Sequence, residues 1–226
     1  MPDYRIRYEK RGALRYISHL DLMRTFERAF RRAELPVAFT EGFHPHPRVG
    51  LGPALPLGVE STAEYLDLSL TGDIDPMSLQ SRLNQSLPPN LHVTQVKLIH
   101  IKAKPLTAVI NRATYLYDEI TGSEGLALEE IMQELWERNE LWVNRRTKEK
   151  IEKKINIRPL WHGWKVEEGK DGLSIVVEFE ISNNGSVRPD EFLNFLPETI
   201  YVGRVSRTGL WIQNDLGRFL PDDLVG

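Results

Sequence analysis

Two histidines in a glycine- and proline-rich stretch are the residues whose types and spacing best suit chemistry. His44 and His46 are separated by one residue, and two imidazoles at this spacing can supply two ligands to a zinc or iron ion. His19 and Asp21 could complete such a site. Prolines on both sides of His46 constrain the backbone, so the alternative is that the imidazoles bond to backbone groups of an irregular loop.

His46 and His19 are also candidates for general acid–base catalysis, because histidine titrates near neutral pH. His19 follows Ser18 at the predicted start of a helix, where backbone N–H groups favour an anion. A phosphate could bind there, with Arg15 and Arg24 nearby. The alternative is an ordinary capped helix start with a surface histidine.

Basic side chains suited to a phosphate backbone occur in two parts of the sequence. The first part holds arginines at helical spacing near the N-terminus, and the second is the segment 144–158. The candidate nucleic-acid-binding residues are Arg15, Arg24, Arg28, Arg31, Arg48, Lys150, Lys153, Lys154 and Arg158, with Lys148 beside them. Tyr115, Tyr117, Trp161 and Trp164 could stack on bases if a sheet exposes them, although aromatic residues in alternating strands usually belong to the core.

Residues 41–60, EGFHPHPRVGLGPALPLGVE, contain four glycines and four prolines. Neither residue type suits the interior of a helix or a central strand, so the stretch is predicted to be a loop. Its apolar residues provide surface that can pack, and we predict an ordered loop that presents His44, His46 and Arg48. The candidate residues of the loop and the preceding helix are Ser18, His19, Asp21, Gly42, Phe43, His44, His46, Arg48 and Gly52.

Alternating and helical patterns predict the elements that position this loop. After Ser18, apolar residues fall on one face of a long helix and arginines on another. The expected elements of the first half are strands at 3–9, 36–40, 64–70 and 91–101, one helix that begins after Ser18, and a second that Asp75 caps and Pro76 begins.

The second half repeats the order of elements. The expected elements are a strand at 107–120, an acidic helix at about 124–138, paired strands at 155–166 and 173–182, a short helix opened by Pro189, and one or two strands at 199–212. The order β-α-β-β-α-β occurs twice, so we predict an α+β protein of two tandem ferredoxin-like units with antiparallel sheets. The predicted domains are 1–103 and 104–213, followed by a loosely held tail at 214–226.

Composition excludes several classes of protein. Of 226 residues, 41% are hydrophobic and 27% are charged, which is ordinary for a globular protein. Because the chain has no run of roughly 18 apolar residues and no signal-peptide pattern at its N-terminus, we expect a cytoplasmic protein without membrane contact. Cysteine is absent, which excludes disulfides, a cysteine nucleophile and thiolate-bound iron–sulfur clusters.

Charge is unevenly distributed although the net charge is only −3. Residues 1–50 carry a local charge of +4, residues 118–140 carry −7, and residues 144–158 carry +5 from seven bases and two acids. A basic face is therefore possible on a mildly acidic protein. The glycine spacing matches neither a P-loop nor a dinucleotide fingerprint, and the common hydrolase and metalloprotease motifs are missing.

The segments RYISHLDLMRTFERAFRRAELPVAFTEGFHPHPRVGLGPALPLGVES and KKINIRPL resemble the radical-SAM-linked proteins, a bacterial family of unknown function. The motif positions by this resemblance are Ser18, His19, Asp21, Gly42, Phe43, Pro45, His46, Pro47, Gly52, Pro53, Ala54, Leu55, Pro56, Gly58 and Arg158. Position 44 is usually Asn in that family, and this departure weakens the two-histidine metal hypothesis. The resemblance implies a cytoplasmic accessory in radical-SAM chemistry that acts on RNA.

Radical-SAM enzymes bind their iron–sulfur cluster through cysteines, so any such chemistry must occur on a partner of this chain. We therefore expect a non-catalytic accessory or substrate-binding module for a radical-SAM enzyme, with tRNA or rRNA as substrate and no cofactor of its own. One alternative is an RNA-processing or RNA-modifying enzyme that uses His46 or His19 as acid or base. Another is a protein–protein adaptor whose acidic helix, 124–138, docks a basic partner.

Overall fold

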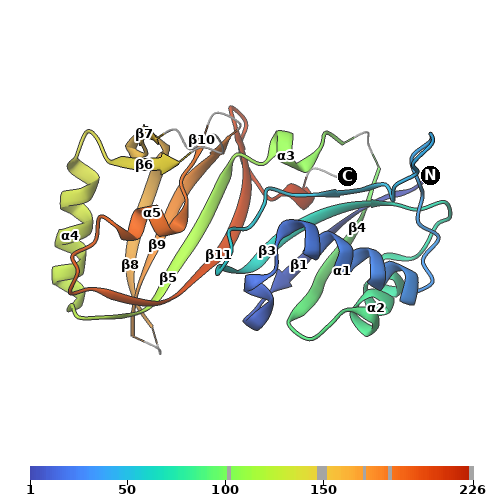
Figure 1. Ribbon diagram of the computed structural model, residues 1–226, viewed down its shortest axis with the longest axis horizontal. Coiled ribbons are helices and arrows are strands. Elements are labelled where there is room, and N and C mark those ends of the chain that lie inside the picture. Colours follow the sequence, from blue (N-terminus) through green and yellow to red (C-terminus); the bar gives the residue numbers. More distant parts are fainter. Residues whose placement is uncertain (101–102, 147–151, 170–171, 183–184, 224–226) are drawn as a thin grey trace. The chain divides into compact units, whose positions relative to one another are not determined.

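The computed structural model describes residues 1–100, 103–146, 152–169, 172–182 and 185–223 (Figure 1). The protein is mixed α+β with mostly antiparallel strands, as the sequence predicts. The chain divides into two compact units, Met1–Asn111 with Gly209–Gly226 (unit 1) and Arg112–Thr208 (unit 2). The boundaries predicted from the sequence, after residues 103 and 213, stay predictions. Among the helices in the described ranges, none is long and apolar enough to cross a membrane.

Unit 1 is built on an antiparallel sheet. Its strands are β1 (Asp3–Lys10), β2 (Val49–Leu51), β3 (Glu60–Ser69) and β4 (Leu91–Ile99). They pair in the order β2-β3-β1-β4. Strand β11 (Tyr201–Asn214) begins in unit 2 and ends in unit 1, where β12 (Gly217–Phe219) pairs with it.

Two helices cover one face of this sheet, α1 (His19–Arg32) and α2 (Pro76–Ser86). In β1 the side chains of Tyr4, Ile6 and Tyr8 are buried at alternate positions and pack with the apolar faces of both helices. The predicted caps are confirmed, because Ser18 accepts a hydrogen bond at the start of α1 and Asp75 does so at the start of α2. The unit also contains short turns of helix at η1 (Gly12–Tyr16), α3 (Leu106–Val109) and η3 (Pro221–Asp223).

Unit 2 is also built on antiparallel strands. Its strands are β5 (Arg112–Thr121), β8 (Trp161–Gly169), β9 (Gly172–Ser182), β10 (Gly185–Ser186) and the first part of β11. Both β5 and β8 pair antiparallel with β9. Two further strands, β6 (Trp142–Arg146) and β7 (Glu152–Asn156), form a separate two-stranded sheet. The helices are α4 (Gly125–Glu137), α5 (Pro189–Leu193) and the 3₁₀ turn η2 (Arg158–Leu160).

An aromatic core fills unit 2. Tyr115, Tyr117 and Trp161 are at most 3% exposed, and Trp161 and Tyr117 both contact the ring of Phe192 at 5.2 and 5.4 Å between centroids. Trp164 is half-buried. The hypothesis that these aromatic residues stack on bases is therefore wrong for the first three, because the alternation of the strands turns them toward the interior.

Three expected elements differ in the structure. The strand predicted at 107–120 starts later, at Arg112, because a turn of helix follows Pro105. In the segment 36–40, Val37 and Phe39 make only isolated bridges, since Pro36 lacks an N–H and shortens the pairing. The strand predicted at 155–166 is interrupted by the 3₁₀ turn η2, which begins one residue before Pro159.

The described part of the tail, residues 214–223, is packed, contrary to the expectation of a loosely held end. Strand β12 pairs with β11, and Pro221 and Asp222 are buried. The carbonyl and carboxylate oxygens of this segment accept hydrogen bonds from β1, β3 and β4, and these contacts fix it to unit 1.

Candidate nucleic-acid interface

The first part of the glycine- and proline-rich loop is a hairpin, residues 38–48, which we call the loop hairpin. The Arg48 N–H donates to the Ala38 carbonyl at 2.8 Å, and the Thr40 N–H donates to the His46 carbonyl at 2.8 Å. The His46 N–H donates to Thr40 Oγ1 at 3.0 Å, so both backbone groups of His46 are bonded. Gly42 has a φ of +123° in the turn, a conformation that favours glycine.

The tip of the loop hairpin presents side chains to solvent. Phe43 is fully exposed, and His44, His46 and Arg48 are exposed as well. An aromatic ring in this position buries no apolar area in unit 1 and contributes nothing to its core. The hairpin therefore exposes one aromatic ring and two imidazoles near its tip, and the guanidinium of Arg48 at its base.

The second part of the loop anchors it. Leu55 and Val59 are buried, and the Gly52 N–H donates to the Tyr65 carbonyl at 2.9 Å. A Cβ at position 52 would lie 3.2 Å from that carbonyl oxygen, so the close approach of the two chains explains the glycine. Gly52 is therefore structural in this fold.

The start of α1 already contains an anion. The Ser18 hydroxyl donates to the Asp21 carboxylate at 2.7 Å, while the Asp21 N–H donates to Ser18 Oγ at 3.1 Å. The hydrogen bond from Ser18, with the charge of Arg24 at 3.4 Å, lowers the pKa of Asp21 below its ordinary value. His19 is the exposed first residue of the helix. Because the Asp21 carboxylate lies in the first turn of the helix, its negative charge disfavours a second anion at the helix start.

Arginines cover the exposed face of α1. Arg24, Arg28 and Arg31 are exposed, whereas Leu22 and Phe26 on the opposite face are buried. Within the described residues, Arg28 and Arg31 make no ion pair, and Arg48 makes none either. These three guanidinium groups are therefore available to an anionic partner.

A groove of about 200 Å³ connects this helix with the base of the loop hairpin. It is lined by Glu27, Phe30 and Arg31 of α1 and by Leu35, Pro36, Val37, Phe39 and Pro47. Phe39 is half exposed at the groove. Arg31 and the hairpin base therefore line the same depression. We call the combination of α1 arginines, groove and loop hairpin the hairpin–helix surface.

Arg15 has a different environment within unit 1. Its guanidinium lies 3.1 Å from Glu60 and 4.9 Å from the centroid of the Tyr16 ring. Glu60 also accepts a hydrogen bond from the Gly12 N–H at 2.9 Å. These contacts connect η1 to the end of the loop, so they give Arg15 a structural role as well.

The chain matches a protein family over residues 3–189, a range that includes α1 and the whole loop. That family is described as "Uncharacterized protein conserved in bacteria (DUF2344)". The chain belongs to the DUF2344 family. No curated protein matches the chain. DUF2344 membership supports the expectation of a bacterial protein from a family of unknown function.

The described basic residues of the segment 144–158 that were predicted to bind nucleic acid have different environments. Lys153 and Lys154 are exposed on β7, whereas Lys148 and Lys150 lie outside the described residues. Arg158 lies at the end of α4, where it donates to the Trp136 carbonyl at 2.7 Å and to the Arg138 carbonyl at 3.1 Å. Its guanidinium is also 4.1 Å from the centroid of the Trp136 ring. The DUF2344 match includes Arg158, and its contacts indicate a structural role.

Metal ligands do not gather in the described part of this DUF2344 chain. No group of three or more His, Asp or Glu side chains there is placed to bind a metal ion. His44 and His46 are exposed at the hairpin tip, and His19 and Asp21 belong to the helix start.

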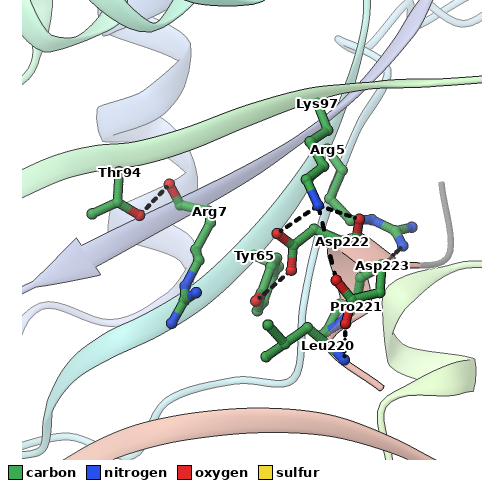
Figure 2. Close-up of polar contacts among 9 residues, drawn as sticks. All are labelled: Arg5, Arg7, Tyr65, Thr94, Lys97, Leu220, Pro221, Asp222 and Asp223. Atoms are coloured by element: carbon green, nitrogen blue, oxygen red, sulfur yellow. Dashed lines mark hydrogen bonds and ion pairs between the residues drawn. The ribbon is translucent and has the colours of Figure 1, made fainter. Parts of the chain in front are cut away.

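A second polar cluster in unit 1 was missed by the analysis of the sequence. Figure 2 shows Arg5, Tyr65 and Lys97 directed at the segment Leu220–Asp223, which lies beyond the DUF2344 match. Burial is the main cause that raises the pKa of the Tyr65 hydroxyl well above its ordinary value, and the charge of Asp222 adds to it. Alternation in β1 predicts that Arg5 faces away from the core, but the tail is more than 200 residues distant in sequence from Arg5.

Proposed function

We propose that this protein is a non-catalytic module that binds RNA through the hairpin–helix surface. The observation that carries the proposal is the groove, because it places Arg31 of α1 beside the base of a hairpin whose tip exposes Phe43. Arginines can contact phosphates, and an exposed aromatic ring can stack on a base of any sequence. The surface thus offers the two kinds of contact that sequence-tolerant RNA binding uses.

We also propose a radical-SAM enzyme as the partner that performs chemistry on the bound RNA. The support is the resemblance of residues 15–61 and 153–160 to radical-SAM-linked proteins, together with the absence of cysteine from the sequence. A chain without thiolates cannot bind the cluster that this chemistry needs. Co-purification with a candidate enzyme, with and without ribonuclease treatment, tests whether RNA bridges the two.

The scaffold of this module is, in our proposal, two ferredoxin-like units. In unit 1 the support is the element order β1-α1-β2-β3-α2-β4 with strand order β4-β1-β3-β2. In unit 2 the elements β5-α4-β8-β9-α5-β11 follow the same sequence, and β5, β9 and β8 are neighbours in that order. The β6–β7 hairpin is then an insertion between α4 and β8.

A filter-binding titration of the protein with a tRNA at several salt concentrations tests the RNA proposal. Binding should weaken as salt rises, since phosphate contacts release counterions. An absent signal, or binding that ignores salt, would contradict the proposal.

Catalysis by His46 is the alternative that one observation favours. Both backbone groups of His46 are bonded to Thr40, so the hairpin fixes the position of an exposed imidazole. Incubation of RNA with the purified protein separates the two functions. Cleavage or modification that disappears in His46→Ala would establish the enzyme, and intact RNA that stays bound supports the module. His19→Ala is the matching test for the other candidate base.

A further inference from the structure

The face of the unit 1 sheet opposite α1 and α2 carries charged residues in register. Arg5 pairs with Asp67 on one side and Lys97 on the other, and Arg7 pairs with Tyr65 and Gln95. Side chains on directly opposed positions of neighbouring strands lie on the same face and close together. Across β3, β1 and β4 these registers form the rows Asp67–Arg5–Lys97 and Tyr65–Arg7–Gln95. The two rows place three cations and one aromatic ring on one surface, and their one acid is Asp67.

Residues 220–223 occupy this face through their acceptor atoms. Arg5 Nη1 donates to the Pro221 carbonyl at 2.6 Å, and its Nε and Nη2 each lie 2.8 Å from the Asp67 carboxylate. The Tyr65 hydroxyl donates to Asp222 Oδ1 at 2.9 Å. Lys97 Nζ donates to the Asp222 carbonyl at 2.9 Å and lies 3.4 Å from Asp222 Oδ2 (Figure 2).

The segment keeps its shape through its own bonds. The Asp223 N–H donates to the Leu220 carbonyl at 3.0 Å, and the Leu220 N–H donates to Asp223 Oδ2 at 3.0 Å. It follows an exposed turn that contains Asp215 and Leu216. The sheet therefore contacts the segment through donors, which are two cationic side chains and one hydroxyl, and the segment supplies oxygen acceptors. The oxygens of a phosphodiester backbone are acceptors of the same kind.

Arg7 adds an unused donor to this face. Its Nε is buried, and within the described part of the chain it has no hydrogen-bond partner. Its guanidinium carbon lies 5.9 Å from the centroid of the Tyr65 ring. A buried donor without a partner is costly, and an anionic ligand beside Tyr65 would remove that cost.

We infer that this face is a second binding surface for single-stranded RNA, and that residues 220–223 compete with RNA for it. We call it the sheet face, and it is formed by Arg5, Arg7, Tyr65 and Lys97. The inference rests on the proposed RNA function and adds a regulated surface to it. Some RNA-binding domains bind unpaired bases on aromatic residues of an antiparallel sheet face, and Tyr65 lies on β3, a strand with neighbours on both sides. The observed affinity is therefore the affinity of the open face multiplied by the fraction of molecules in which the segment has left the face.

The test compares Asp222→Asn with Asp215→Asn in the full chain, with an oligouridine as probe. Both variants remove one acidic charge, but only Asp222 contacts the face, whereas Asp215 is exposed in the preceding turn. Asp222→Asn should tighten oligouridine binding about five-fold or more, because the face opens more often. Asp215→Asn should change it little. An equal effect of both variants, or no effect of either, would overturn the inference.

Two further variants test whether the tighter oligouridine binding arises at this face. Tyr65→Phe keeps the ring for stacking and removes only the hydroxyl that donates to Asp222, so it should also tighten binding. Addition of Lys97→Gln to Asp222→Asn should cancel the gain. If Asp222→Asn unfolds the chain, Tyr65→Phe carries the same test alone.

The outcomes separate this inference from the proposed function. Oligouridine binding by Asp222→Asn together with no binding by the wild type would support the sheet face and contradict the hairpin–helix surface. Binding by the wild type that neither Asp222→Asn nor Tyr65→Phe alters would overturn the sheet face and leave the hairpin–helix surface intact.

Discussion

Two hydrogen bonds between Ser18 and Asp21 set the electrostatics at the start of α1. They satisfy a backbone donor that the helix leaves open and stabilise the charged carboxylate. The lowered pKa of Asp21 means that this stabilisation is present above the unfolded-state pKa of Asp21 and is lost as the pH falls through the folded-state pKa.

Ser18→Ala should raise the pKa of Asp21 toward its ordinary value, because the hydroxyl is the main cause of the shift. Loss of the cap should also lower the free energy of unfolding by about 1 kcal/mol. An NMR titration of the Asp21 carboxyl and a urea denaturation curve measure the two effects. An unchanged pKa would show that Arg24, and not Ser18, controls this carboxylate.

Substitution of Phe43 tests RNA binding without disturbing the fold. Because its ring is fully exposed, Phe43→Ala should leave the melting temperature unchanged. It should weaken binding to single-stranded RNA roughly ten-fold if the ring stacks on a base. Met77→Ala, at an exposed position of α2, is the matched control and should change neither quantity. Equal affinities of Phe43→Ala and wild type would remove Phe43 from the proposed surface.

At the scale of elements, the sequence predicts best what is local. The cap and periodicity of α1, the start of α2 at Pro76 and the alternation in β1 were correctly predicted because neighbouring residues determine them. The predicted loop was found to contain a hairpin, which its glycines and prolines permit but do not specify. The interruption at η2 was missed, since the strand-like run around it continues on both sides of Arg158.

Arg158 shows how a long-range contact changes the role of a residue. In the sequence it belongs to a basic segment, but in the fold it bonds to carbonyls at the end of α4 and stacks against Trp136. Spacing in the sequence carries no signal for these contacts because Trp136 is 22 residues away.

Arg158→Ala should therefore lower the free energy of unfolding by about 3 kcal/mol, because the carbonyls at the end of α4 lose a charged donor. Arg158→Lys should restore little of it, since lysine lacks the planar group that bonds and stacks at once. Chemical denaturation of both variants measures this. A loss of RNA affinity in Arg158→Ala without a loss of stability would contradict the structural role and support a phosphate contact by Arg158.

At the scale of the whole molecule, unit 1 carries two proposed binding surfaces, and only one of them was predicted from the sequence. The α1 arginines and the loop were identified as candidates from their residue types, and the groove brings both together. The sheet face was not identified, because its residues are covered by a segment that follows them by more than 100 residues. Nearby patterns in sequence predict exposed sites better than they predict contacts between distant segments.

The measurement that tests the central claim most directly is the salt dependence of RNA binding in the triple variant Arg24→Gln, Arg28→Gln and Arg31→Gln. Its matched control is Arg11→Gln, Arg138→Gln and Lys165→Gln, which removes the same charge from three exposed positions outside the surface. Three lost phosphate contacts should reduce the slope of log affinity against log salt by about 2 in the triple variant, with the control close to wild type. Slopes that are equal in all three proteins, or lowered equally by both variants, would contradict RNA binding at the hairpin–helix surface.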